Sequence, residues 1–168
     1  MANPMSWPLA AFISFMSGPW SEEFGWRGYA LEPLLKHTGN IRGSLIMGML
    51  WGVWHFPLFL MPATWHGQMG FKLAGFWTFI LMSIGLSLIM TWVYRNTNRS
   101  ILVGMLLHFA SNFTGQLLAP ISDRTEVVKS ILYFVVGLTA CLLFNRRTAS
   151  EESKPITNTP VEKISQGI

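Results

Sequence analysis

Long apolar segments alternate with short polar ones along most of the chain. Four segments are predominantly apolar over a length close to the roughly 20 residues that a helix needs to cross a bilayer. They are residues 43–60, 73–94, 100–119 and 127–144. The pattern therefore predicts four membrane-spanning helices joined by short connections.

The N-terminal part of the chain is also apolar, but it is interrupted. Residues 1–20 are expected to form a short or broken membrane segment, because they contain Pro4, Pro8, Gly18 and Pro19. Ser21 is typical of an N-cap, and it predicts a helix that begins with two acidic residues and runs to about Lys36. The expected stop is Gly39.

Small residues recur at every fourth position in two of the predicted helices. The two stripes are Ser44, Gly48, Gly52 and Ser83, Ser87, Thr91. Such stripes let helix backbones approach closely in a membrane, whereas Pro57 is expected to kink or end the helix that contains it. We therefore predict an all-α, polytopic transmembrane bundle of about five to six membrane helices.

The polar segments define the connections and a tail. The expected connections are residues 61–72, 95–99 and 120–126. From residue 145 onward the chain is rich in Ser, Thr, Pro, Glu and Lys, a composition that cannot bury a core. We expect one membrane domain over residues 1–144 and a disordered tail over residues 145–168.

Composition agrees with a membrane protein. The chain is 51% hydrophobic and only 12% charged, against about 25% charged residues in an average soluble domain. The formal charge of +4 is modest, and we interpret it through the positive-inside rule and expect no nucleic-acid partner.

Basic residues distribute unequally between the two sides of the predicted bundle. One side carries Lys36, Arg42, Arg95, Arg99, Arg146 and Arg147, and the other carries Lys72, Arg124 and Lys129. The first side is expected to be cytoplasmic, which places the C-terminal tail in the cytoplasm. The expected location is a bacterial plasma membrane.

Two adjacent carboxylates and an arginine stand within the apolar N-terminal third. Charges in such surroundings are costly unless they are paired, so they mark a functional site by default. In a helix Glu23 and Arg27 share a face, while Glu22 is rotated by about 100° from Glu23. The pattern therefore predicts a Glu23–Arg27 pair and a Glu22 that is free for chemistry.

Other polar residues lie at a similar depth on two further predicted helices. At about 1.5 Å per residue from the nearest cytoplasmic basic residue, Glu22 and His55 lie roughly 20 Å deep and His108 roughly 14 Å. Asn112 is one turn beyond His108. This alignment predicts one polar pocket built from three helices.

Together these motifs resemble those of the CPBP intramembrane proteases, also called the Abi or CAAX-protease group, which are related to the Rce1-type prenyl-protein endopeptidase. That family has a double glutamate with an arginine four residues on, an aromatic residue followed four on by His, and His followed four on by Asn or Asp. Here the motifs are Glu22-Glu23 with Arg27, Trp51 with His55, and His108 with Asn112.

The resemblance implies roles for these residues and a class of substrate. Glu22 would be the catalytic base that activates a water, with His55 assisting. His108 and Asn112 would stabilise the oxyanion, and Glu23 and Arg27 would hold the first helix in place. The substrate would be a membrane-associated protein or peptide, prenylated or not. Members usually carry further membrane helices before the double glutamate, so we expect an N-terminally short bundle.

The sequence leaves three alternatives open. A zinc site could use Glu22, His55 and His108, but no H-E-x-x-H motif is present, which favours a mechanism without a cofactor. A non-catalytic membrane scaffold or bacteriocin-immunity protein could retain the fold. A transporter could use the same residues as a proton path, but it would favour inverted repeats, which the sequence does not show.

Overall fold

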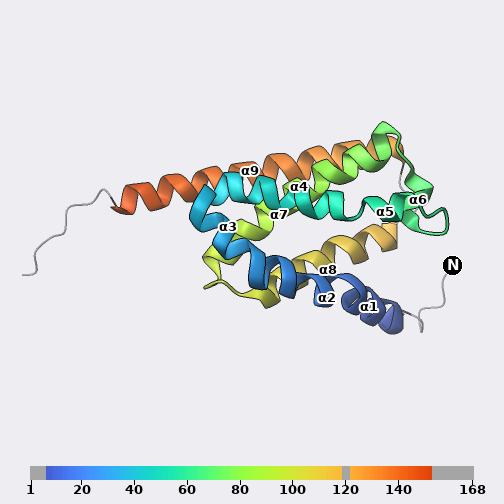
Figure 1. Ribbon diagram of the computed structural model, residues 1–168, viewed down its shortest axis with the longest axis horizontal. Coiled ribbons are helices and arrows are strands. Elements are labelled where there is room, and N and C mark those ends of the chain that lie inside the picture. The colour runs from blue at the N-terminus through green and yellow to red at the C-terminus, as the bar shows by residue number, and fades with distance from the viewer. Residues whose placement is uncertain (1–6, 119–121, 153–168) are drawn as a thin grey trace, which may run out of the picture.

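The computed structural model describes residues 7–118 and 122–152. Within these ranges the chain is helical, contains no strand, and forms five rods that pack side by side (Figure 1). Three rods are long and apolar enough to cross a membrane: Leu73–Asn96, Ile101–Leu118 and Asp123–Arg146. The prediction of an all-α membrane bundle is confirmed, with three candidate spans among the described residues where about five to six membrane helices were predicted.

The first rod runs without a gap from residue 7 to residue 38. It consists of α1 (Trp7–Phe15), the π-helical η2 (Met16–Trp20), α2 (Ser21–Glu23), the π-helical η3 (Phe24–Ala30) and α3 (Leu31–Thr38). Gly39, with φ of 77°, ends it where the sequence predicted.

The predicted N-cap at Ser21 is wrong. The residue before Ser21 is itself helical, and the Ser21 hydroxyl donates to the carbonyls of Ser17 and Gly18, at 3.1 Å each. Pro19 has no N–H to donate, and the wider turn of the π-helix accommodates this loss without breaking the rod. A π-helical turn inside an α-helix is often found at a functional site.

The second rod contains the break that Pro57 predicted. Helix α4 (Asn40–Trp54) ends at His55, and α5 (Phe56–Phe59) follows it. A short helix, α6 (Trp65–Met69), lies within the predicted loop, and the Thr64 hydroxyl caps it by accepting from the Gly67 amide at 3.0 Å. The turn η4 (Leu73–Trp77) then leads into α7 (Thr78–Asn96).

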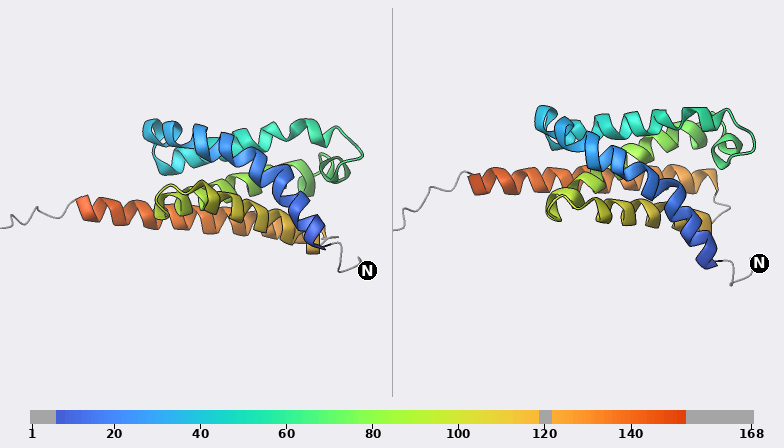
Figure 2. Two further views of the ribbon diagram at one scale, coloured as in Figure 1. Left: turned by 90° about the horizontal axis from the view of Figure 1, so that it is seen from below. Right: turned by 60° about the horizontal axis from the view of Figure 1, so that its bottom comes forward.

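Helix α7 is the centre of the bundle. It packs against α4 on one side and against α9 (Asp123–Glu152) on another, while the first rod crosses α8 (Ile101–Leu118), as Figures 1 and 2 show. In the most apolar 18-residue window of each helix, 61% of the residues are buried for α7, but only 17% are buried for α8 and 17% for α9. The apolar surfaces of α8 and α9 are therefore those available to lipid.

Both predicted stripes of small residues lie at buried helix contacts. All six residues of the two stripes are buried. A Cβ on Gly48 would meet the backbone of Ile84 in α7, and a Cβ on Gly52 would lie 2.8 Å from the Ile80 side chain. The missing side chains are what allow α4 and α7 to approach each other at this distance.

A glycine on α7 that lies outside these stripes supports the first stability prediction. A Cβ on Gly85 would collide with the backbone of α9 at Tyr133 and Phe134. Gly85→Ala is therefore expected to destabilise the fold by about 1–3 kcal/mol, because the helices must separate. Unfolding by denaturant in detergent would measure this. Gly115→Ala, where a Cβ meets nothing within 4 Å, is the matched control and should not destabilise.

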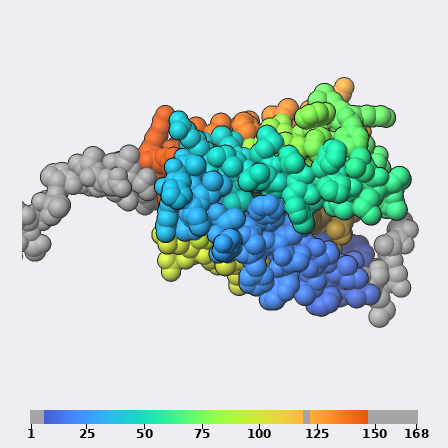
Figure 3. All heavy atoms as spheres, in the orientation of Figure 1, coloured from blue at the N-terminus to red at the C-terminus, as the bar shows by residue number. Residues whose placement is uncertain are grey.

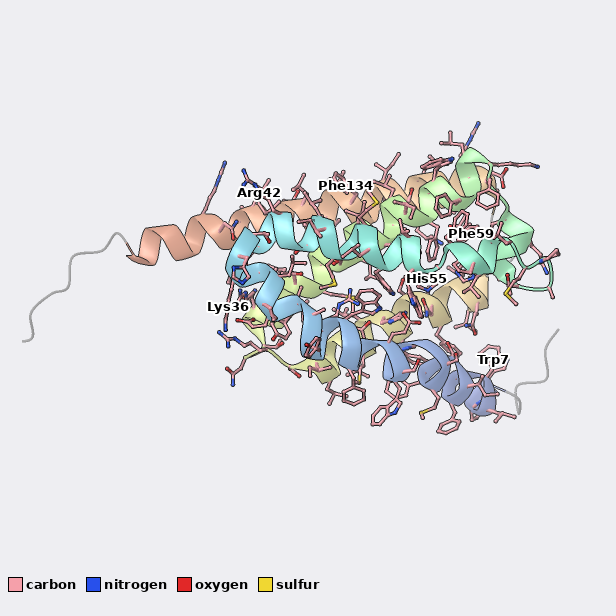
Figure 4. The ribbon with its side chains drawn as sticks, in the orientation of Figure 1. Trp7, Lys36, Arg42, His55, Phe59 and Phe134 are labelled. Atoms are coloured by element: carbon pink, nitrogen blue, oxygen red, sulfur yellow. The ribbon has the colours of Figure 1, made fainter. Side chains whose placement is uncertain are left out.

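Basic residues that the sequence assigned to one side lie together at one end of the bundle. Lys36 and Arg42 lie at one end (Figure 4), where Arg95 also donates to Asn40 at 3.0 Å and pairs with Glu32 at 3.4 Å. Which side of the membrane this end faces stays a prediction.

Helical structure extends past residue 145, where the sequence predicted that the tail begins. Helix α9 continues to Glu152, and Asn40 donates to the Asn145 side chain at 3.0 Å, which ties this turn of α9 to α4. Residues 145–152 are thus helical, and the remainder of the predicted tail lies outside the described residues.

Candidate active site

A cavity of about 650 Å³ lies inside the bundle and is lined by residues from all five rods. Glu22, His55, His108 and Asn112 all line it, which confirms that the three polar motifs share one pocket. In Figure 4 His55 lies between the α4–α5 rod and α8, and Figure 3 shows atoms of α8 between the first rod and the α4–α6 segment.

Three polar atoms converge beside Gly18. A Cβ built on this buried glycine would lie 3.4 Å from Asn112 Nδ2, 3.5 Å from Glu22 Oε1 and 3.6 Å from His108 Nε2. These atoms come from two different rods, and all three face the side of Gly18 on which any other residue would carry its Cβ. A water molecule or a substrate oxygen that lies against Gly18, between the three atoms, could contact all of them.

Glu22 is half-buried and held by one of its two oxygens. The Trp51 indole N–H donates to Glu22 Oε2 at 2.8 Å, and the other oxygen, Oε1, is the one that lies near Gly18. Trp51 is itself only 4% exposed. One carboxylate oxygen is therefore fixed by a hydrogen bond while the other faces the cavity.

His55 is oriented by the backbone of its own helix. Its Nδ1 lies 2.9 Å from the Trp51 carbonyl, which can only accept, so Nδ1 is the donor. The Nε2 atom is then left without a proton in the neutral ring. Pro57 ends the regular helix here, and His55 occupies the junction between α4 and α5.

Glu23 contacts both Arg27 and His108. Its Oε1 accepts from Arg27 Nη1 at 2.9 Å and from His108 Nδ1 at 2.9 Å. Glu23 is fully buried, and Arg27 and His108 are almost so. The Glu23–Arg27 pair was predicted, but the bond to His108 was not, and it leaves His108 Nε2 directed at the cavity.

Arg27 is also placed over the Trp51 ring, with Cζ 4.6 Å from the ring centroid. A cation over an indole face is favourable, and more so when water is excluded. Trp51 therefore contacts Glu22 through its N–H and Arg27 through its face.

His66, which the sequence placed in a loop, lines the same cavity from α6. Its ring centroid lies 5.4 Å from that of His55. Burial, and secondly the neighbouring His55, lower the pKa of His66 to about 4. His66 is therefore uncharged at neutral pH.

Sequence reasoning missed four features of the site: Gly18, the hydrogen bond from Trp51, the contact of Glu23 with His108, and the bond from Tyr133 to Ser111 at 3.1 Å. A signal existed for Trp51, because a buried indole N–H usually finds a partner and Trp51 lies one turn from His55, which was placed at the depth of Glu22. Nothing in the sequence singles out Gly18, whose role depends on the distances between rods.

The residues present do not fit a preformed metal site. Within residues 7–118 and 122–152 no three His, Cys, Asp or Glu side chains are grouped closely enough to hold a metal ion. One oxygen of Glu22 is already bonded to Trp51, although Glu22, His55 and His108 all line the cavity. Among the described residues, Glu22, His55 and His108 are therefore not arranged as a preformed set of zinc ligands.

Comparisons with known proteins give consistent results. A sequence model of the family described as type II CAAX prenyl endopeptidase Rce1-like matches residues 4–114. The protein named CAAX prenyl protease 2 of Methanococcus maripaludis is 28% identical over 141 residues, which cover 78% of this chain and 48% of the relative. The chain thus spans about half the length of this curated relative. The matched residues contain all three polar motifs.

Proposed function

Because the chain belongs to the Rce1-like family of type II CAAX prenyl endopeptidases, we propose that it is an intramembrane endopeptidase in which Glu22 activates a water molecule. Its substrate is a membrane-associated protein or peptide, and a carboxyl-terminal CAAX sequence is the first candidate. The observation that carries the proposal is the convergence of Glu22, His108 and Asn112 on the point beside Gly18.

The nucleophile is a water placed between Glu22 Oε1 and the substrate carbonyl. Glu22 takes a proton from this water as its oxygen bonds to the carbonyl carbon, and His55, at the opposite wall, assists through its free Nε2. General base catalysis by a positioned side chain contributes about 10²–10⁴-fold to a rate. The Trp51 hydrogen bond restricts Glu22 to the orientation that this step requires.

The developing oxyanion is stabilised from α8. Asn112 donates from Nδ2 and His108 donates from Nε2, two groups that lie one helical turn apart. Donation from both nitrogens of His108 requires the imidazolium form, and the positive charge then faces the Glu23 carboxylate. Donors fixed in advance are effective because they need no reorganisation when charge develops.

Collapse of the intermediate breaks the C–N bond. The proton that Glu22 accepted passes to the leaving amine, and Glu22 returns to its ionised form. The products are a new carboxylic acid and an amine, and the acid then gives its proton to the amine, which leaves a carboxylate and an ammonium group. Glu23 and Arg27 take no part in this transfer. They hold His108 and the first rod in position.

Gly18→Ala is expected to reduce kcat/KM by at least about 10²-fold while the protein still folds. The added methyl group would be in ordinary contact with its neighbours, at 3.4 Å or more, but it would occupy the space assigned to the water and the oxyanion. The control is Gly25→Ala in the same rod, where a Cβ meets nothing within 4 Å. Equal activity of Gly18→Ala and the control would contradict the assigned water position.

The direct test of the activity is a peptide library. The purified protein in detergent would be offered membrane-anchored peptides with carboxyl-terminal CAAX sequences, prenylated and unprenylated, and mass spectrometry would locate any cleaved bond. Cleavage that persists with a chelator supports the glutamate mechanism. Chelator inhibition that added zinc reverses would overturn it. Absence of cleavage of every peptide would favour a non-catalytic scaffold.

A further inference from the structure

The end of the cavity formed by α8 and α9 holds a charge that the proposed mechanism does not use. Lys129 of α9 is the one lysine or arginine among the described residues that line the cavity. Its ammonium pairs with Glu126 of the same helix at 2.7 Å, and its side chain is 25% exposed. Ions beside a mainly apolar cavity are costly unless they are paired, and Glu126, which pairs with Lys129, does not itself line the cavity.

The position of Lys129 relative to the proposed reaction centre follows from α9. Tyr133, one turn after Lys129, donates to Ser111, and Ser111 immediately precedes Asn112 on α8. One turn of helix is about 5.4 Å long. Along the axis of α9, Lys129 therefore lies about 5.4 Å from Tyr133, the residue that bonds α9 to α8. The adjoining wall is formed by the last turns of α8, including Gly115 and Gln116.

This separation is within the reach of a short peptide. A CAAX sequence consists of a cysteine followed by three carboxyl-terminal residues, so cleavage after the cysteine releases a tripeptide. Three extended residues span about 10 Å at most. With the scissile carbonyl at Asn112, a chain of this length is long enough to reach past the turn that carries Lys129, so the terminal carboxylate of a bent tripeptide can lie there.

The remainder of the wall suits the intervening residues. Apolar side chains line the cavity beside the polar groups, among them Leu58, Phe79, Met82, Leu86 and Leu118. Aliphatic side chains of a peptide can be buried there. Glu126 shows that a carboxylate is accommodated against the Lys129 ammonium, which has three protons to donate.

Resting on the proposed function, we infer that Lys129 binds the terminal α-carboxylate of the substrate and of the released tripeptide. Lys129 is thus a specificity residue for peptides that end in a free acid close to the cleaved bond. Glu126 balances the charge of Lys129 while the cavity is empty and competes with the incoming carboxylate. Helix α9 lies outside residues 4–114, the part of the chain that the family model matches.

The test compares one tripeptide in two forms. The purified protein would be titrated with Val-Ile-Met as the free acid and as the carboxyl-terminal amide, with calorimetry as the readout. The acid should bind about tenfold more tightly to the wild type, and Lys129→Gln should abolish that preference. Lys129→Arg should retain it, which separates lost charge from misfolding. Glu126→Gln, which removes the competitor, should strengthen binding of the acid.

The inference is overturned if the wild type binds acid and amide equally, or if the preference survives in Lys129→Gln. Product binding needs no catalysis, so this result is independent of the peptidase assay. Binding of the acid through Lys129 without cleavage of any peptide would reject the proposed function but keep the carboxylate site. Cleavage of acid and amide peptides with equal KM would reject the site and keep the function.

Discussion

Glu22→Gln is expected to abolish peptide hydrolysis, with a fall in kcat of about 10²–10⁴-fold. Glutamine has nearly the same shape, and its amide oxygen can still accept the Trp51 N–H that Glu22 Oε2 accepts at 2.8 Å. The cavity should therefore be preserved while the base is lost. Because the change acts on the chemical step, kcat should fall and KM should change little.

The matched control for this variant is Glu32→Gln. Glu32 lies at the basic end of the bundle, where it pairs with Arg95 and Arg99 at 3.4 Å, and it does not line the cavity. The Glu32→Gln variant removes one negative charge, as Glu22→Gln does, but it does not change the cavity. The activity of this variant should therefore match that of the wild type. Full activity in Glu22→Gln together with loss in Glu23→Gln would reassign the base to Glu23.

Arg27→Met is expected to destabilise the protein by about 3–5 kcal/mol, the range found when one partner of a buried ion pair is removed. The variant leaves the fully buried Glu23 carboxylate with His108 alone. It also removes the cation from the Trp51 ring. Unfolding in mixed detergent micelles would measure the loss.

The double variant Glu23→Gln/Arg27→Met tests the reason for that loss. The double variant removes both charges of the pair. It should be more stable than Arg27→Met, because the loss of stability in Arg27→Met comes mainly from the Glu23 charge that is left without its partner. Glu23 Oε2 and Arg27 Nη2 are buried without a partner in the structure, which adds to the cost of keeping the pair. A double variant that is even less stable than Arg27→Met would show that the pair stabilises the rod on its own account.

The fold and the composition of the pocket could be predicted because helices in a bilayer are regular. A constant rise per residue converts sequence position into depth, and this was enough to place Glu22, His55 and Asn112 around one cavity. Periodic small residues such as Gly48 also predicted which helix faces are in contact.

Rotation about the helix axis was harder to predict than depth. The π-helical turns on both sides of Glu22 and Glu23 change the angle between successive side chains, so faces assigned from a regular α-helix are displaced. The bond of Glu23 to His108 and the bond of Glu22 to Trp51 depend on this rotation. The Ser21 cap failed for the same reason, because a wider turn replaced the expected break.

The residues around Trp51 are expected to vary less among relatives of this chain than the residues at the other end of the cavity. The Trp51 N–H fixes Glu22, its carbonyl fixes His55, its face holds Arg27, and its ring lies 5.0 Å from that of His108. A change in the width of the cavity at this end would disturb every one of these groups together, so it has little scope to vary.

The α9 end has no such constraint, since the ion pair of Lys129 is with Glu126 of its own helix. With the role proposed for Lys129, substitutions there would alter which peptide terminus is accepted without moving the groups around Trp51. New substrate preferences in relatives of this chain should therefore arise on α9, and the surroundings of Trp51 should stay the same.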